Sequence, residues 1–190
     1  YLLFFAKKVF TAKKIKENFP NRYKNKIIEV GPILNKNIIN FSNSEKNKNK
    51  NKFFFSILVL GGSQGAEIFG KISPTVIKMI KEKGYSIEII QQCVKKQKQT
   101  LIEFYEKHNV KNYVFEFDAN ILKSILSSDL AITRCGASTT AELTHTLTPF
   151  IAVPLPNSID DHQYLNAKFY KEKGCCWVLE QKDFNTENLF

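Results

Sequence analysis

A glycine-rich turn, Gly61-Gly62-Ser63-Gln64-Gly65-Ala66, separates an apolar run from a stretch with helical spacing. Glycines after a buried strand let the backbone turn sharply and approach a ligand closely. The helix that follows presents free N–H groups and the positive end of its dipole, which suit a phosphate, and Ser63 and Gln64 add side-chain donors. The turn is neither the GxGxxG fingerprint nor a P-loop. Taken alone, it is therefore equally compatible with a packing turn and a phosphate site.

Residues 134–142 (RCGASTTAE) repeat this arrangement, with a glycine turn after an expected strand and hydroxyl side chains at the start of an expected helix. Glu142 could accept hydrogen bonds from a ribose diol, as acidic residues do in nucleotide-binding folds. Thr139 and Glu142 also have the spacing of a capping box, and this spacing taken alone favours a helix cap. Two such loops in one sheet, however, could direct two helix N-termini at one pyrophosphate.

A third candidate is the sequence DDHQYLNA at residues 160–167, where two carboxylates precede a histidine. On a helix the two carboxylates would point about 100° apart, and Ser158 and Asp161 have capping-box spacing. This segment therefore predicts a helix start rather than a metal site. Gln163 and Asn166 lie at i and i+3 on one face of the expected helix, so their amides could bind the hydroxyls of a sugar together.

The alternation of apolar and amphipathic segments places these loops at the ends of strands. We expect strands at residues 53–60, 85–91, 113–117, 129–133, 149–153 and 176–179. We expect helices at residues 66–83, 95–108, 121–127, 139–147 and 161–173. Strands that alternate with helices of this length require right-handed crossovers. The expected fold class is α/β, a Rossmann-like parallel sheet with helices on both faces, which binds ligands at the carboxyl ends of its strands.

The chain divides into three expected parts. Residues 1–33 carry two short expected strands, at 8–11 and 26–30, around a helical segment, and this predicts the last βαβ piece of a truncated preceding domain. Residues 34–52 end in a Lys/Asn-rich stretch, which predicts a solvated, low-complexity linker. Residues 53–190 form the expected α/β domain, which we expect to be incomplete at its C-terminus.

The basic character of the chain is confined to its N-terminal part. Residues 1–52 carry 13 basic and three acidic side chains, and this balance equals the net charge of +10 of the whole chain. Residues 53–190 are therefore neutral, which argues against a nucleic-acid partner. Because no Cys-x-x-Cys pair occurs, we expect the reduced thiols of a cytoplasmic protein at the four cysteines, which are Cys93, Cys135, Cys175 and Cys176.

Together the motifs resemble those of a known family. The glycine turn, the pattern RxGAxTxxE at 134–142, the prolines Pro149 and Pro154, and the pattern DHQxxNA at 161–167 have the order and spacing of the MurG family of bacterial glycosyltransferases. From about residue 7 onward the chain is similar to the C-terminal half of that family. The resemblance implies a GT-B arrangement of two Rossmann-like domains, of which this one holds UDP-N-acetylglucosamine (UDP-GlcNAc).

The resemblance also implies which residues bind the donor. The glycine turn would contact the pyrophosphate, and residues 137–140 would lie near the nucleotide and diphosphate. The backbone at Asp118 would read the uracil edge, and Glu142 would bind the ribose hydroxyls rather than act only as a cap. Gln163, with Asn166, would hold the sugar. The implied substrate-binding residues are Ser63, Gln64, Gly65, Phe117, Asp118, Ile121, Ala137, Ser138, Thr139, Thr140, Glu142, Gln163 and Asn166.

The implied reaction is an inverting transfer of N-acetylglucosamine from UDP-GlcNAc to lipid I, which makes lipid II for peptidoglycan. It would take place peripherally, at the cytoplasmic face of the bacterial inner membrane. Helix N-termini would offset the charge on the departing UDP, so we expect no metal and no cofactor.

The family places its acceptor loops, its candidate base and its membrane-facing patch in the N-terminal domain. No catalytic residue is therefore assigned in this chain, which we expect to be inactive alone. Where the family places an arginine after the glycine that ends that domain, this chain has Asn35 and Lys36, so the phosphate contact of that arginine is not carried over.

Two other classes of function remain open. A related sugar-nucleotide enzyme, either a glycolipid glycosyltransferase or a UDP-GlcNAc 2-epimerase, would use a similar donor site. An epimerase would want further acid–base residues in the cleft, and we find none in the sequence. A non-catalytic UDP-sugar-binding subunit, which completes its site with a separate partner, would need only the binding residues.

Overall fold

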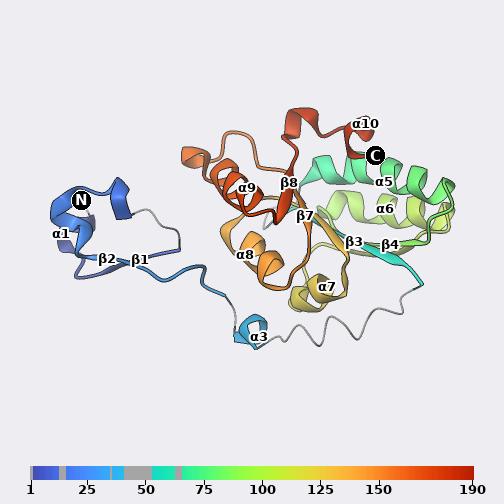
Figure 1. Ribbon diagram of the computed structural model, residues 1–190. Coiled ribbons are helices and arrows are strands. Elements are labelled where there is room, and N and C mark those ends of the chain that lie inside the picture. Colours follow the sequence, from blue (N-terminus) through green and yellow to red (C-terminus); the bar gives the residue numbers. More distant parts are fainter. Residues whose placement is uncertain (1, 13–15, 35, 41–52, 63–65) are drawn as a thin grey trace.

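The computed structural model describes residues 2–12, 16–34, 36–40, 53–62 and 66–190 (Figure 1). Its first part comprises helix α1 (Leu2–Phe5), strand β1 (Val9–Thr11), the 3-10 turn η1 (Lys16–Asn18), helix α2 (Asn21–Lys24) and strand β2 (Ile27–Glu29). The two expected strands are present and pair in parallel, with Val9 opposite Ile27. Of the expected helical segment between them, residues 13–15 lie outside the described part.

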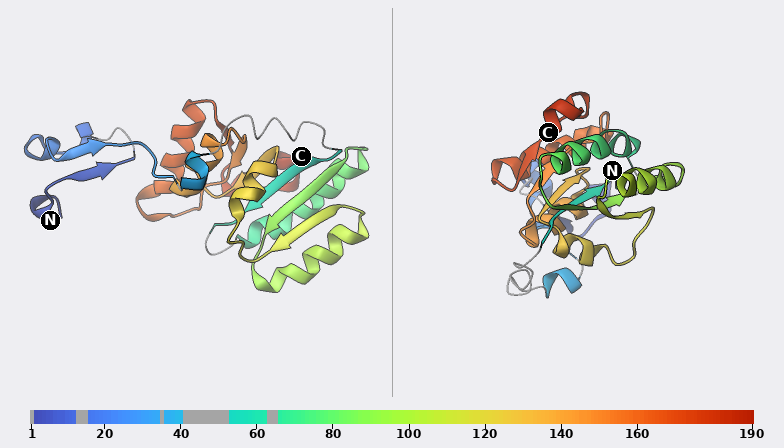
Figure 2. Two further views of the ribbon diagram at one scale, coloured as in Figure 1. Left: turned by 90° about the horizontal axis from the view of Figure 1, so that it is seen from below. Right: turned by 90° about the vertical axis from the view of Figure 1, so that its right-hand side faces the viewer.

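This first part lies apart from the rest of the molecule, as Figures 1 and 2 show. The short helix α3 (Lys36–Ile39) follows it and packs against the main domain beside helix α8 (Ala137–His145). The Lys/Asn-rich stretch lies outside the described residues. In the part of the chain that the structure describes, no helix is both long enough and apolar enough to cross a membrane.

The main domain is built on one sheet of six parallel strands (Figure 1). The strands are β3 (Phe55–Leu60), β4 (Ile87–Gln92), β5 (Lys111–Phe115), β6 (Leu130–Thr133), β7 (Phe150–Ala152) and β8 (Cys176–Val178). Their order across the sheet is β5-β4-β3-β6-β7-β8. The chain therefore builds one half of the sheet outward from β3 and then returns to build the other half from β6.

Helices cover both faces of this sheet, as the sequence predicts. Besides α8, they are α5 (Glu67–Glu82), α6 (Lys95–Lys107), α7 (Ile121–Ser127), α9 (His162–Glu172) and α10 (Thr186–Leu189). Side chains of β3 alternate between the two cores, because successive residues of a strand face opposite ways. Ile57 and Val59 pack with α5 and α6, whereas Leu58 and Leu60 pack with α7, α8 and α9. The expected α/β, Rossmann-like fold class is confirmed.

Two predicted boundaries need correction where they bear on the site. The third strand was expected at 113–117 but spans Lys111–Phe115, because it pairs with β4 from Glu88 opposite Lys111 to Gln92 opposite Phe115. Phe117 is therefore in the loop beyond the strand. Helix α8 begins at Ala137 and not at residue 139, because Gly136 adopts the extended backbone of an N-cap residue. The other elements of the sheet and its helices end within two residues of their expected bounds.

Candidate functional site

The carboxyl ends of β3 and β6 lie side by side at the centre of the sheet. From β3 the chain crosses to β4, and from β6 it crosses to β7 on the opposite side. The loops after the two strands therefore diverge and open a crevice, which is where ligands bind in sheets of this topology. The amide of Arg134 donates to the carbonyl oxygen of Leu60 at 3.1 Å. This bond joins the loop after β6 to the end of β3.

A hollow of about 310 Å³ lies at this crevice, within the range of small-ligand pockets, roughly 300–1,000 Å³. It gathers residues from the ends of β3, β4 and β5 and from the first two turns of α7 and α8. Its lining residues are Leu60, Gly62, Gln92, Phe115, Glu116, Phe117, Asp118, Ile121, Ile125, Thr139 and Glu142. Five of the implied substrate-binding residues thus line one cavity: Phe117, Asp118, Ile121, Thr139 and Glu142.

The carboxylate of Asp118, in the loop after β5, is engaged by residues of its own loop and of α7. Asp118 accepts a hydrogen bond from the amide of Asn120 at 2.7 Å and one from the hydroxyl of Ser124 at 3.5 Å. These bonds shape the entry to α7 and place Ile121 at the wall of the cavity. Phe117 is 83% exposed, so its ring is available to a flat ligand at the mouth of the hollow.

The start of α8 does not form the capping box that the spacing of Thr139 and Glu142 suggested. Gly136 is the N-cap and no side chain caps the helix, so Thr139 lies in the third helical position. The hydroxyl of Thr140 donates to the carbonyl oxygen of Gly136 at 2.9 Å, and Thr140 is fully buried. Ala137 and Ser138 are exposed at the first turn.

Glu142 is half-buried at the wall of the hollow, and burial raises the pKa of its carboxyl above the usual value of 4.5. Among the residues that the structure describes, none donates a hydrogen bond to its carboxylate. A desolvated carboxylate without a protein partner is costly unless a ligand supplies donors. Glu142 is therefore placed to accept hydrogen bonds from hydroxyl groups in the cavity.

The two predicted sugar ligands lie beside the β6–α8 turn and bond to the backbone. The side-chain oxygen of Gln163 accepts from the amide of Cys135 at 3.1 Å and from the amide of Leu155 at 3.0 Å. Asn166 is buried, and its Nδ2 donates to the carbonyl oxygen of Cys135 at 3.0 Å. These bonds orient Gln163 so that its amide nitrogen, a donor only, is the group left for a ligand. They also show that Asn166 fastens α9 to the β6–α8 turn.

The observed start of α9 differs from the capped start that the sequence predicted. The hydroxyl of Ser158 accepts from the amide of Gln163 at 3.3 Å, so Ser158 and Asp161 do not form a capping box. Asp160 and Asp161 both adopt left-handed backbone conformations in the 3-10 turn η2 (Ile159–Asp161). Within the described ranges, no group of three or more His, Cys, Asp or Glu side chains is placed to hold a metal ion.

Three of the residues assigned to the pyrophosphate, Ser63, Gln64 and Gly65, lie outside the described residues. Some residues that line the cavity were not predicted from the sequence, among them Gln92. The Nε2 of Gln92 donates to the carbonyl oxygen of Glu116 at 3.2 Å. The available signal was the position of Gln92 at the carboxyl end of its strand. The four cysteines are free, as expected.

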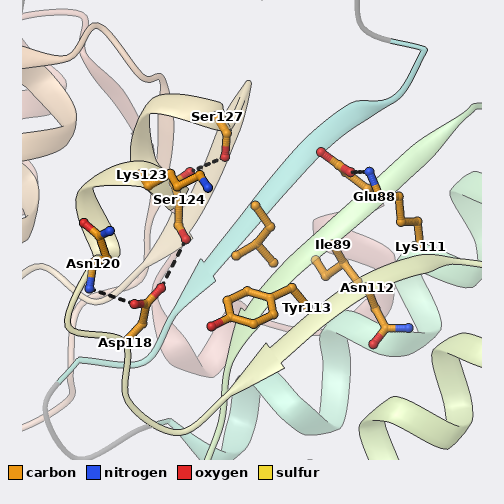
Figure 3. Close-up of a pocket in the computed structure, with 11 residues that line it drawn as sticks. Glu88, Ile89, Lys111, Asn112, Tyr113, Asp118, Asn120, Lys123, Ser124 and Ser127 are labelled. Carbon is orange, nitrogen blue, oxygen red and sulfur yellow. Dashed lines mark hydrogen bonds and ion pairs between the residues drawn. The ribbon is translucent and has the colours of Figure 1, made fainter.

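A second and larger hollow of about 520 Å³ lies over β4 and β5 beside α7 (Figure 3). It shares Asp118 with the first hollow but contains no other residue singled out as a ligand. Its far end is closed by an ion pair of 2.7 Å between Lys111 and Glu88. Because it lies away from the ends of β3 and β6, we take the smaller cavity as the candidate site.

Several curated proteins are similar to this chain along its length. The UDP-N-acetylglucosamine–N-acetylmuramyl-(pentapeptide) pyrophosphoryl-undecaprenol N-acetylglucosamine transferase of Pelagibacter ubique is 35% identical over 189 residues, which cover 100% of this chain and 52% of that protein. The protein of the same name from Rickettsia felis is 37% identical over 192 residues, which cover 97% of this chain and 53% of that protein. The chain thus spans about half the length of the curated relatives it matches.

A solved structure agrees with this likeness. The crystal structure of Acinetobacter baumannii MurG superposes with a TM-score of 0.71 at 26% identity, over 90% of this chain and 48% of that one. The model of the glycosyltransferase family 28 C-terminal domain matches residues 56–190, which comprise the six-stranded sheet except Phe55 and the whole candidate site. The chain therefore belongs to glycosyltransferase family 28, of which it carries the C-terminal domain.

Proposed function

We propose that this chain is the donor-binding part of an inverting glycosyltransferase that moves N-acetylglucosamine from UDP-GlcNAc to lipid I in peptidoglycan synthesis. The observation that carries the proposal is the cavity at the carboxyl ends of β3, β4 and β5 beside α7 and α8, which gathers Asp118, Ile121, Thr139 and Glu142. The names of the curated relatives support this choice of donor and acceptor.

In this proposal the nucleotide fills the cavity with its uracil at the backbone of Phe117 and Asp118 and its ribose hydroxyls at Glu142. The diphosphate lies between the glycine turn after β3 and the first turn of α8. Exposed N–H groups at the start of α8, a helix of nine residues, would offset its charge. No metal and no cofactor are needed for this arrangement, so we propose that none is used.

The sugar would lie at Gln163, whose nitrogen can donate to a hydroxyl or carbonyl oxygen. Asn166 would not contact the sugar directly. Its amide donates to the carbonyl oxygen of Cys135, and it would thereby hold the β6–α8 turn in place. The C4 hydroxyl of the acceptor's muramyl sugar would attack the anomeric carbon from the face opposite the leaving UDP. We propose that the base which activates this hydroxyl, and the surface which meets the membrane, are not among these 190 residues.

Calorimetric titration with UDP-GlcNAc, UDP-glucose and UDP tests the proposal. We expect UDP-GlcNAc to bind more tightly than UDP-glucose, because the acetamido group adds a carbonyl acceptor for a donor amide such as that of Gln163. Equal affinity for the two sugars would leave Gln163 without its proposed role. Absence of binding to all three would refute the donor site itself, and conversion of UDP-GlcNAc into its 2-epimer would favour the epimerase alternative.

A further inference from the structure

Arg134, the first residue after β6, carries a positive charge into the interior beside the candidate site. Only 8% of the residue is exposed. Its Nη1 donates to the carbonyl oxygens of Val153 and Pro154, each at 3.2 Å, and its Nη2 donates to the side-chain oxygen of Gln181. The guanidinium carbon lies 5.1 Å from the centroid of the Phe69 ring. Each of these partners is electrically neutral.

Among the described residues, no carboxylate forms an ion pair with this guanidinium. The acidic residue next to its partner Gln181 is Glu180, which is paired with Lys182 at 3.1 Å. Burial lowers the pKa of the Arg134 guanidinium, which reflects the cost of keeping a cation out of water. A neutral side chain could donate to the same oxygens at a smaller desolvation cost. A charge at this position is therefore better explained by an anion that binds nearby than by the hydrogen bonds alone.

The surroundings of the charge indicate where such an anion would lie. Phe69 belongs to the first turn of α5, a helix of 16 residues, so the guanidinium packs on a side chain from the N-terminal end of that helix, where the helix dipole is positive. Gly62 has a φ of +80°, and a Cβ at that residue would come within 3.9 Å of the Cβ of Arg134. The glycine turn thus passes directly against Arg134. Both features place the charge at the crevice between β3 and β6.

We propose that Arg134 is a positioning residue for the diphosphate of the bound nucleotide. It acts through its charge, which adds to the field of the α5 N-terminus, while its hydrogen bonds to the carbonyl oxygens of Val153 and Pro154 keep the guanidinium beside the crevice. No direct contact between the guanidinium and a phosphate oxygen is required. The inference rests on the proposed function, because the anion it invokes is the diphosphate of that donor.

The decisive variant is Gln181→Glu, which keeps an acceptor for Nη2 and sets a carboxylate against the buried cation. Gln181→Met is its matched control, because it removes the hydrogen bond and leaves the charge of Arg134 unopposed. Each protein is titrated with UDP and with uridine, and its thermal stability is recorded. For Gln181→Glu we expect UDP affinity to fall by about 5- to 30-fold with uridine affinity and thermal stability maintained. For Gln181→Met we expect the ratio of UDP to uridine affinity to stay at the wild-type value.

Arg134→Gln is the second test, since it removes the charge and keeps a donor for the carbonyl oxygens. We expect the same selective loss of UDP affinity. Equal losses for UDP and uridine in this variant, or unchanged UDP affinity in a folded Gln181→Glu protein, would overturn the inference and leave Arg134 as a scaffold residue.

Inorganic pyrophosphate, titrated against wild type and Gln181→Glu, separates this inference from the proposed function. If wild type binds pyrophosphate but no uridine nucleotide, the UDP-sugar proposal fails. In that case a weaker affinity of Gln181→Glu for pyrophosphate would still support the role of Arg134, and an equal affinity would refute it. If wild type binds neither ligand, both proposals fail.

Discussion

At the scale of single residues, Glu142 is the most informative side chain of the site. Its carboxylate is half-buried at the cavity wall and has no donor among the described residues. Loss of a charged hydrogen bond to a ribose hydroxyl costs about 1–3 kcal/mol. We therefore expect Glu142→Ala to weaken UDP binding by that amount in calorimetry. If the contact is to the ribose, 2′,3′-dideoxy-UDP should bind wild type and variant equally, and a variant that weakens both ligands to the same degree would contradict it.

The same carboxylate predicts a pH dependence of stability. The folded-state pKa of Glu142 is raised by burial above 4.5, so its contribution to stability is present at low pH and is lost as the pH rises through the raised value. Glu142→Gln should therefore be at least as stable as wild type at pH 7, and this difference should disappear below pH 4.5. Thermal unfolding across pH 4–8 measures this, and a variant less stable than wild type at pH 7 would contradict it.

Gln163 offers a substitution that separates structure from binding. Gln163→Glu keeps an oxygen for the amides of Cys135 and Leu155 but removes the nitrogen donor. We expect it to unfold at a temperature close to that of wild type and to lose affinity for UDP-GlcNAc more than for UDP. Gln163→Leu is the matched control: it leaves the two amides without a partner, at a cost of about 1–3 kcal/mol each if they stay buried. Similar unfolding temperatures for the two variants would contradict the assigned bonds.

At the scale of elements, the glycine turn after β3 can be tested through its backbone. Gly62 has a φ of +80°, and a side chain in that conformation costs roughly 1–2 kcal/mol. Gly62→Ala should therefore lower both the free energy of unfolding in urea and the affinity for UDP. Gly84 has a φ of +91° with open space around it, and it precedes the amino end of β4, whereas the cavity lies at the carboxyl end of that strand. Gly84→Ala should lower stability by a similar amount and leave UDP affinity unchanged.

Helices and strands whose apolar residues recur at regular spacing could be predicted from the sequence. Strands whose ends are set by hydrogen bonding to a neighbouring strand could not. Helix α7 was predicted at both ends because Asn120 and Ser128 bound a short apolar segment. Strand β5 was misplaced by two residues because its first two residues, Lys111 and Asn112, are polar and add no apolar signal. Its register comes from the partner strand β4.

The candidate site shows the same division. The loops that line it could be predicted, because strand ends and glycines mark them. The bonds of Gln163 could not, because its partners Cys135 and Leu155 lie 28 and eight residues away and meet it only when α9 docks. The role of Thr139 in a cap was predicted from spacing and was wrong, because Gly136 provides the helix start.

At the scale of the whole molecule, the chain has a cavity that we propose binds the donor, and no assigned catalytic base. We expect this 190-residue chain to bind UDP-GlcNAc weakly and to transfer no sugar to lipid I in a radiolabel assay. Hydrolysis or transfer above the background without protein would contradict this expectation. A full-length relative assayed in parallel controls for the quality of the lipid substrate.

The cavity is lined by strand ends and helix starts that are spread along the sequence from Leu60 to Glu142. It therefore forms only when the separate βα units have assembled. Such long-range closure is a late event in folding, and a ligand that binds only the finished form draws the equilibrium toward it. UDP should therefore slow hydrogen exchange across all of β3 to β6 and not only at its contact points. Nucleotide binding would then report that the whole domain has assembled, because a chain with one misplaced crossover would lack the cavity.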